Sequence, residues 1–157
     1  MERILCLLTG YVFGLFQTGY LYGKMHHIDI RQYGSGNSGT TNALRVMGKK
    51  AGLLVFMGDF LKTVSACLLV RLVMKGNPSV DLYVLYAGLG VVLGHNFPFY
   101  LHFKGGKGIA SMAGILVSMD WRVTLVCASL FLGAVILTRY VSLGSILVVT
   151  AFFIQMV

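Results

Sequence analysis

The stretch Gly34-Ser35-Gly36-Asn37-Ser38-Gly39-Thr40-Thr41-Asn42, followed by Ala43-Leu44-Arg45, separates two apolar runs of the chain. Successive backbone N–H groups in a glycine loop form a concave anion site. A helix that starts near Thr41 adds further N–H donors and a positive dipole end. Arg45 would then lie one turn after Asn42 on the same face, where its guanidinium can fork onto phosphate oxygens. The pattern indicates a phosphate-binding loop at a membrane surface. A Gly/Ser linker between two helices is the alternative.

Known nucleotide loops have a different pattern. The stretch lacks Gly-x-x-x-x-Gly-Lys-Ser/Thr, and no predicted strand precedes it. A nucleotide-binding interpretation is therefore weak.

Composition places the chain in a membrane. Of its 157 residues, 57% are hydrophobic and 11% are charged, whereas soluble domains carry about 25% charged residues. The net charge of +8 comes from cations clustered between apolar runs, which is typical of cytosolic loops facing anionic lipid and not of nucleic-acid binding. Cys6, Cys67 and Cys127 are isolated in apolar runs, so we expect small core residues and neither a disulfide nor a metal site.

We predict an all-α, polytopic transmembrane helix bundle with about six membrane segments, some of them short or broken, forming one domain over residues 1–157. No small-residue cleavage pattern follows the first segment, so we expect a retained helix and not a signal peptide. Gly10-x-x-x-Gly14 and Gly19-x-x-x-Gly23 are predicted to be close-packing faces. The expected segments are Ile4–Tyr22, Ala51–Met74, Leu82–Leu101, Ile109–Met119, Val123–Thr138 and Val141–Val157.

Two charged residues, Asp59 and Lys62, lie inside the second segment. They are three positions apart and therefore share a helix face. Charges inside a membrane are expensive and usually face a polar interior. We expect a mutually neutralising pair that holds the bundle together. A supporting role beneath the active loop stays open.

A second glycine-rich stretch follows the third segment. It consists of Gly94-His95-Asn96-Phe97-Pro98 and then Phe103-Lys104-Gly105-Gly106-Lys107-Gly108. Pro98 ends or kinks the helix where His95 and Asn96 appear. The glycines and the two lysines predict a second anion-binding loop, although an isolated histidine at this position is more often an interfacial one.

The distribution of Lys and Arg predicts the orientation. If both glycine loops share one side, that side carries Lys24, Arg31, Arg45, Lys49, Lys50, Lys104, Lys107 and Arg139, against Arg3, Arg71, Lys75 and Arg122 on the other. The excess predicts that the loops are cytosolic and that the N-terminus is outside.

Together, Ser35–Asn42 with Leu44-Arg45 and Gly48-Lys49, the segment Asp59-Phe60-Leu61-Lys62, and the second glycine stretch resemble the bacterial acyl-phosphate:glycerol-3-phosphate acyltransferases of the PlsY type. The resemblance covers the whole chain. It implies a multi-pass enzyme of the bacterial cell membrane that transfers a fatty acyl group from acyl phosphate to glycerol 3-phosphate. The product would be lysophosphatidic acid, an early intermediate of phospholipid synthesis.

The resemblance and the chemistry of the residues together give the expected site. We expect Ser35, Arg45, His95 and Lys104 to be the catalytic residues, with His95 the candidate base unless the substrate phosphate itself takes the proton. No metal or other cofactor is expected, and acyl phosphate, glycerol 3-phosphate and the lipid bilayer are the expected partners. The remaining phosphate-binding residues are expected to be Gly36, Asn37, Gly39, Thr41, Asn42, Gly105, Gly106, Lys107 and Gly108.

The chain departs from the family at a few places. Ser38 and Thr40 stand where the family commonly has an apolar residue and alanine, and nothing matches a third motif of the form His-Arg-x-Asn-Ile-x-Arg. Two interpretations follow: a chain truncated at its C-terminus, or a short, catalytically inactive paralogue that binds phosphate-bearing lipids or serves as a subunit. A transporter is a weaker alternative, because no internal repeat is visible.

Overall fold

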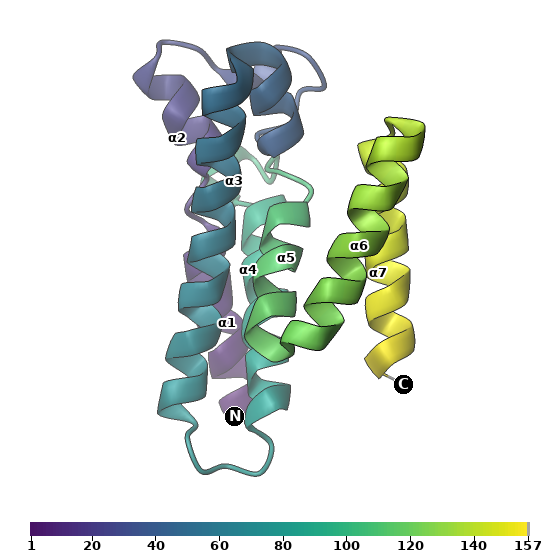
Figure 1. Ribbon diagram of the computed structural model, residues 1–157. Coiled ribbons are helices and arrows are strands. Elements are labelled where there is room, and N and C mark those ends of the chain that lie inside the picture. The colour runs from purple at the N-terminus through teal and green to yellow at the C-terminus, as the bar shows by residue number, and fades with distance from the viewer. Residues whose placement is uncertain (157) are drawn as a thin grey trace. The chain divides into compact units, whose positions relative to one another are not determined.

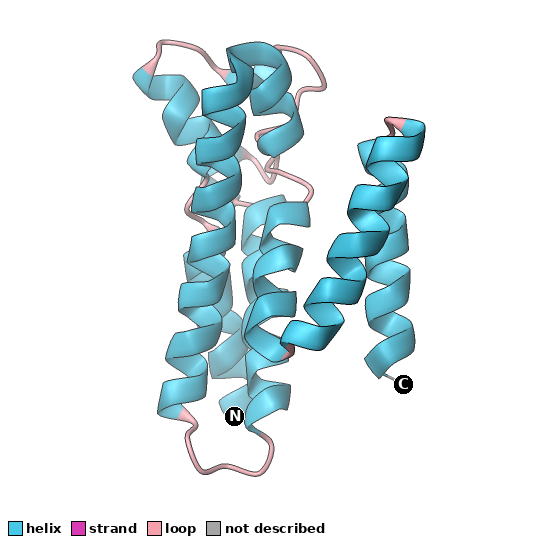
Figure 2. Cartoon of the chain, viewed as in Figure 1, coloured by secondary structure: helices cyan, strands magenta, loops and turns pink. Residues whose placement is uncertain are grey.

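The computed structural model describes residues 1–156, and these residues form helices and loops with no strand among them (Figures 1 and 2). This confirms the all-α prediction. The α-helices are α1 (Glu2–Gly14), α2 (Thr18–Met25), α3 (Thr40–Val73), α4 (Val80–Asn96), α5 (Ile109–Met119), α6 (Trp121–Thr138) and α7 (Val141–Met156), and the short 3-10 helices are η1 (Ile30–Gln32) and η2 (Phe99–Leu101).

The chain divides into two compact units, Met1–Ile115 and Leu116–Val157. The first unit contains α1 to α4 and most of α5, and the second contains α6 and α7. Both glycine loops belong to the first unit. The expectation of one acyltransferase-like domain over the whole chain stays a prediction.

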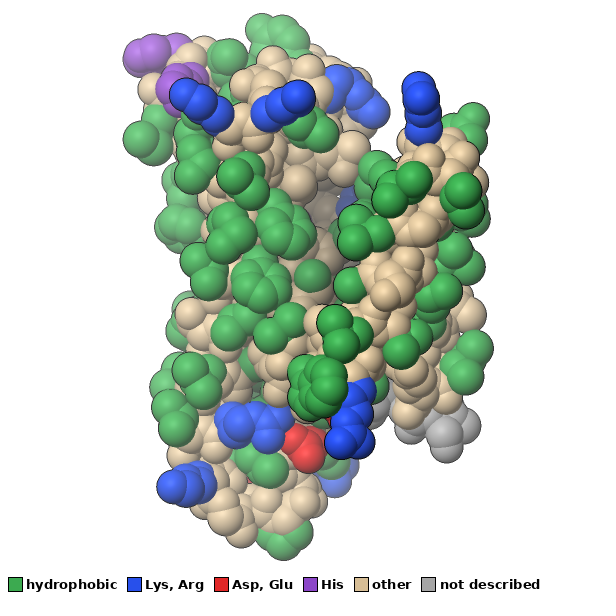
Figure 3. Space-filling model, viewed as in Figure 1, with side chains coloured by type: hydrophobic (Ala, Val, Ile, Leu, Met, Phe, Trp, Pro, Cys, Tyr) green, Lys and Arg blue, Asp and Glu red, His purple; other side chains and the backbone are tan. Residues whose placement is uncertain are grey.

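The helices have the lengths and compositions of membrane segments. Four stretches are long and apolar enough to cross a bilayer: Glu2–Met25, Thr40–Val73, Val80–Leu101 and Trp121–Thr138. Ile109–Met119 and Val141–Gln155 are shorter apolar helices. Large apolar side chains such as Leu53 and Leu72 are exposed on α3, and in Figure 3 hydrophobic side chains cover the middle of the helices while Lys and Arg gather mostly toward the helix ends. The expected multi-pass bundle is confirmed.

Helices α1 and α4 cross closely because glycines line their contact. A Cβ atom at Gly10 would collide with the carbonyl oxygen of Ala87, and one at Gly14 would collide with that of Val91. Gly90 and Gly94 on α4 are packed just as tightly against the α1 backbone. The structure therefore confirms the predicted packing role of Gly10 and Gly14 and adds a matching glycine pair on α4.

The first membrane segment is broken, which corrects the prediction of one continuous helix over Ile4–Tyr22. Helix α1 ends at Gly14, and α2 begins at Thr18. The Lys62 ammonium donates to the carbonyl oxygens of Phe16, at 2.6 Å, and Gly14, at 3.4 Å. A cation at the C-terminal end of a helix complements the helix dipole and satisfies carbonyls that the break leaves without helical partners.

The second unit is a pair of apolar helices. Asp120 caps α6, because its carboxylate accepts a hydrogen bond from the backbone N–H of Arg122 at 2.6 Å. Gly144 on α7 faces the ring of Phe131 on α6. Cys127, also on α6, is buried and forms no disulfide, and the same holds for Cys6 and Cys67 in the first unit. The prediction that all three cysteines are core residues is therefore confirmed.

Candidate active site

Asn42 organises the first glycine loop from inside. Its side-chain amide donates to the carbonyl oxygens of Ile30 (3.1 Å), Tyr33 (3.0 Å) and Asn37 (2.9 Å), and its Oδ1 accepts from the Ser35 N–H at 2.9 Å. The residue is only 2% exposed. Its polar atoms have protein partners, so Asn42 shapes the loop; its expected role in phosphate binding stays a prediction.

Several backbone amides of this loop are also bonded within the protein. Gly36, at φ +68°, donates its N–H to Tyr33 O at 3.1 Å, and Gly39 donates to the Asn37 side chain at 2.8 Å. These two amides therefore already have acceptors within the protein. The polar side chains that this stretch exposes are those of Ser35, Thr41 and Arg45.

Helix α3 begins at Thr40, next to the position that the sequence predicts. Gly39 is its N-cap, and no side chain caps the helix start. Arg45 is exposed within this first part of α3 and makes no ion pair among the described residues. Its guanidinium is therefore available to an anion beside the positive end of a helix.

The second glycine loop folds back on the end of α4. Gly105 donates its N–H to Asn96 O at 3.1 Å, and Gly106 donates to His95 O at 3.0 Å. These two amides, like those of the first loop, already have protein acceptors. Lys104 and Lys107 are exposed, and α5 begins at Ile109 immediately after Gly108.

A buried ionic cluster lies beneath the loops. The Lys62 ammonium is 2.8 Å from Asp59 Oδ1 and 2.9 Å from His95 Nδ1, and Thr18 donates to Asp59 Oδ1 at 3.1 Å. Asp59 is 1% exposed and His95 is 3% exposed. The predicted Asp59–Lys62 pair is confirmed, and it also holds the histidine and the break between α1 and α2.

The cluster brings both ring nitrogens of His95 into contact with other parts of the protein. An ammonium has three hydrogens, and the short contacts of Lys62 direct them at Phe16 O, Asp59 Oδ1 and His95 Nδ1. Nδ1 is thereby in contact with Lys62, and Nε2 lies against Gly106, where a Cβ atom would collide with it. One ring nitrogen therefore contacts the ion pair, and the other contacts the second glycine loop.

Gln17 connects the two loops. Ser38 Oγ of the first loop donates to Gln17 Oε1 at 3.1 Å, and Gln17 Nε2 donates to His95 O at 2.9 Å. The same His95 oxygen accepts the N–H of Gly106 in the second loop. The two loops are therefore linked through Gln17. In Figure 1 the connection between α2 and α3, which contains the start of the first loop, lies at the opposite end of the first unit from the N-terminus. Sequence reasoning assigned Gln17 no role, although an amide side chain in the middle of an apolar run was a signal.

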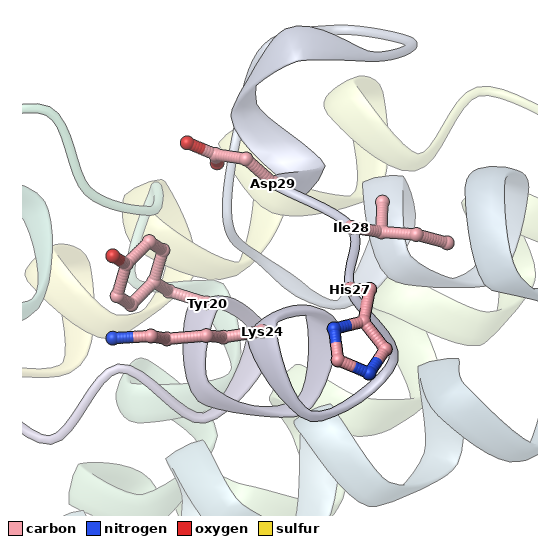
Figure 4. Close-up of a pocket in the computed structure, with 5 residues that line it drawn as sticks. All are labelled: Tyr20, Lys24, His27, Ile28 and Asp29. Atoms are coloured by element: carbon pink, nitrogen blue, oxygen red, sulfur yellow. The ribbon is translucent and has the colours of Figure 1, made fainter.

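A surface pocket of about 260 Å³ lies beside the first loop, lined by Tyr20, Lys24, His27, Ile28 and Asp29. Figure 4 shows Tyr20, Lys24 and Asp29 directed toward the same side, with His27 directed elsewhere. Arg31 donates to the Asp29 carboxylate at 2.8 Å, and this hydrogen bond holds the pKa of that carboxyl below its usual value. None of the lining residues belongs to the predicted site.

Comparisons with known proteins agree with the resemblance. A family described as glycerol-3-phosphate acyltransferase matches residues 4–157. The glycerol-3-phosphate acyltransferase of Thermoanaerobacter sp. (strain X514) is 42% identical over 147 residues, which cover 93% of this chain and 72% of the relative. That of Clostridioides difficile (strain 630) is 40% identical over 148 residues, covering 91% and 71%.

Solved structures show the same likeness. The crystal structure of PlsY (YgiH), described as an integral membrane glycerol 3-phosphate acyltransferase in its glycerol 3-phosphate form, superposes with a TM-score of 0.88 at 35% sequence identity. The match covers 99% of this chain and 76% of that one. The lysophosphatidic acid form of the same enzyme gives a TM-score of 0.85 at 34% identity.

Proposed function

This chain belongs to the glycerol-3-phosphate acyltransferase family, and from that premise we propose that it transfers a fatty acyl group from acyl phosphate to glycerol 3-phosphate. The products are lysophosphatidic acid, for phospholipid synthesis, and inorganic phosphate. The observation that carries the proposal is the meeting of two glycine loops whose cationic side chains are exposed and unpaired among the described residues.

Both substrates carry phosphate, and the loops supply cationic side chains that can bind it. Arg45 lies at the start of α3, and Lys104 and Lys107 precede the start of α5. Charge-assisted hydrogen bonds from such groups are about twice as strong as neutral ones. Arg45, Lys104 and Lys107, with the Ser35 hydroxyl, are therefore the proposed phosphate-binding side chains.

The proposed reaction needs positioning more than new chemistry. A hydroxyl oxygen of glycerol 3-phosphate attacks the acyl carbon, and the bond from that carbon to the phosphate oxygen breaks. The phosphate leaves with the bonding electrons, and the hydroxyl proton must go to a base. Cations that hold both phosphates align the two reactants and stabilise the charge that develops on the leaving group.

We propose that a phosphate oxygen of the substrates receives this proton. His95 is the only base candidate in the matching motifs, but its Nδ1 faces the Lys62 ammonium and its Nε2 faces Gly106. The substrate phosphate lies at the reacting hydroxyl in any productive arrangement. In this proposal His95 has a structural role and supports the site from below the loops.

Acyl phosphate is the proposed donor because the loops are small. The connection from α2 to α3 covers residues 26–39, and Asn42 and η1 organise much of it. A soluble acyl carrier would need a docking surface, and a coenzyme would need an adenine pocket. A phosphate head with a buried acyl tail needs only cations at the membrane face and apolar helices below.

We also propose an orientation in the bacterial cell membrane. The excess of Lys and Arg on the side of the glycine loops favours cytosolic loops and an N-terminus outside. The first loop lies at the opposite end of the first unit from the N-terminus, which is consistent with this orientation.

A panel of donors tests the proposal. The purified, detergent-solubilised protein is incubated with glycerol 3-phosphate and, in turn, with palmitoyl phosphate, palmitoyl-CoA and palmitoyl acyl carrier protein. We expect lysophosphatidic acid from palmitoyl phosphate alone. Product from palmitoyl-CoA but not from palmitoyl phosphate contradicts the proposed donor, and no product from any donor favours the inactive paralogue.

A further inference from the structure

Gln17 lies where the first membrane segment breaks, and its amide is fully buried at 0% exposure. It is the N-cap residue of α2 and has no helical conformation itself, with φ −95° and ψ 85°. A buried amide is costly unless each of its polar atoms finds a partner. The partners of Gln17 come from separate parts of the first unit.

The amide uses both of its ends. Gln17 Oε1 accepts from Ser38 Oγ, and Gln17 Nε2 has three carbonyl oxygens within reach: His95 O at 2.9 Å, Gly14 O at 3.2 Å and Gly94 O at 3.3 Å. Three acceptors on one side fix which end is the NH₂ group. The amide therefore has one orientation in this network.

The backbone around the bridge is packed too closely to shift independently. A Cβ atom at Gly19 would collide with the Ser38 carbonyl oxygen, so the first loop rests directly on α2. On the other side, Gly106 is hydrogen-bonded to His95 O and lies against the His95 ring. Ser38 and Gly106 are thus linked through Gln17 and a single carbonyl oxygen.

We propose that Gln17 is a positioning residue that holds the two glycine loops in register, so that Arg45 on one loop and Lys104 on the other act on the same pair of substrates. The inference rests on the proposed function for its catalytic consequence. Its structural content, a fixed spacing of the loops, is independent of turnover. A displacement of about 1 Å at a catalytic arrangement can cost about a hundredfold in rate.

The kinetic test uses Gln17→Met, which keeps the side-chain length and removes both hydrogen-bonding ends. We expect kcat to fall about tenfold to a hundredfold, with a much smaller change in KM for glycerol 3-phosphate, because the phosphate-binding side chains remain. Gln32→Met is the matched control, since Gln32 is exposed and lies outside the bridge. Wild-type kcat in Gln17→Met overturns the proposal.

A milder pair of variants separates positioning from folding. Ser38→Ala removes one hydrogen bond of the bridge, and Ser38→Thr keeps the hydroxyl. We expect Ser38→Ala to lower kcat, Ser38→Thr to restore most of it, and Ser38→Ala to add little in the Gln17→Met background. Equal losses for Ser38→Ala and Ser38→Thr, or fully additive losses in the double variant, contradict a shared bridge.

A distance measurement tests the loop spacing without any turnover. Spin labels are attached at Thr41→Cys and His102→Cys, both exposed positions, and the distance distribution is measured by double electron–electron resonance. We expect a narrow distribution that broadens or shifts with Gln17→Met and not with Gln32→Met. If the wild-type protein makes no lysophosphatidic acid, the proposed function fails, while this measurement still decides the role of Gln17. An unchanged distribution in Gln17→Met overturns the inference.

Discussion

Replacing Lys62 by methionine should destabilise the first unit more than any exposed lysine would. The substitution keeps most of the apolar stem and removes the ammonium. It leaves Asp59 as a buried carboxylate without its 2.8 Å partner and removes the donor from Phe16 O and from His95 Nδ1.

The magnitude follows from the burial of the pair. The side chains of Lys62 and Asp59 are 5% and 1% exposed, and removing one partner of a buried ion pair typically costs about 3–5 kcal/mol. We expect Lys62→Met to lower the free energy of unfolding by about that amount. Lys50→Met, at an exposed position of the same helix, should change it by less than about 0.5 kcal/mol.

A second substitution separates the ion pair from packing. Asp59→Asn in the Lys62→Met background removes the uncompensated charge, so the double variant should lose less stability than the two single losses added together. Unfolding is followed by far-UV circular dichroism in mixed micelles titrated with dodecyl sulfate, and by the reactivity of the thiols of Cys6 and Cys67, which are buried in the folded unit. A loss below about 1 kcal/mol in Lys62→Met would refute the reasoning.

Two further predictions concern the loops. Cysteines at positions 36 and 104 should resist membrane-impermeant thiol reagents applied to intact cells and react after permeabilisation; labelling of both from outside contradicts the proposed orientation. Arg31 lowers the pKa of Asp29 in the folded protein. The native pair therefore stabilises the fold above the unfolded pKa of about 3.9, and it loses that contribution as pH falls through the lower folded pKa. Asp29→Asn removes the pair, so the stability of this variant should depend less on pH in the acid range. Identical melting-temperature profiles for the two proteins at acid pH rule out that contribution.

The sequence predicted those features that depend on local pattern. Apolar runs gave the membrane segments, the spacing of Gly10 and Gly14 gave a close helix contact, and the three-residue spacing of Asp59 and Lys62 gave an ion pair. The helix start expected near Thr41 is one residue from the observed start at Thr40. Each of these features is set by neighbours within one or two turns.

The features that the sequence did not give depend on partners far along the chain. At the break near Gln17, Lys62 donates to the carbonyl oxygen of Phe16, and the carbonyl oxygen of His95 at the end of α4 accepts from Gln17. Asn42 has a polar side chain of the kind that binds ligands. Its hydrogen-bond partners lie up to 12 positions away, and these hydrogen bonds hold the loop together. His95 looks like a base in its motif, and only the folded chain places Lys62 on its Nδ1.

The most direct test of the central claim compares the wild-type protein with Arg45→Ala in the formation of lysophosphatidic acid from labelled glycerol 3-phosphate and palmitoyl phosphate. The wild-type protein should form product. A charge-assisted hydrogen bond is worth about 1.5–3 kcal/mol, so kcat/KM should fall at least about tenfold in Arg45→Ala. Arg45 is exposed and unpaired among the described residues, so the melting temperature should not change. Equal kcat/KM for the two proteins would contradict the claim that the glycine loops bind the substrate phosphates.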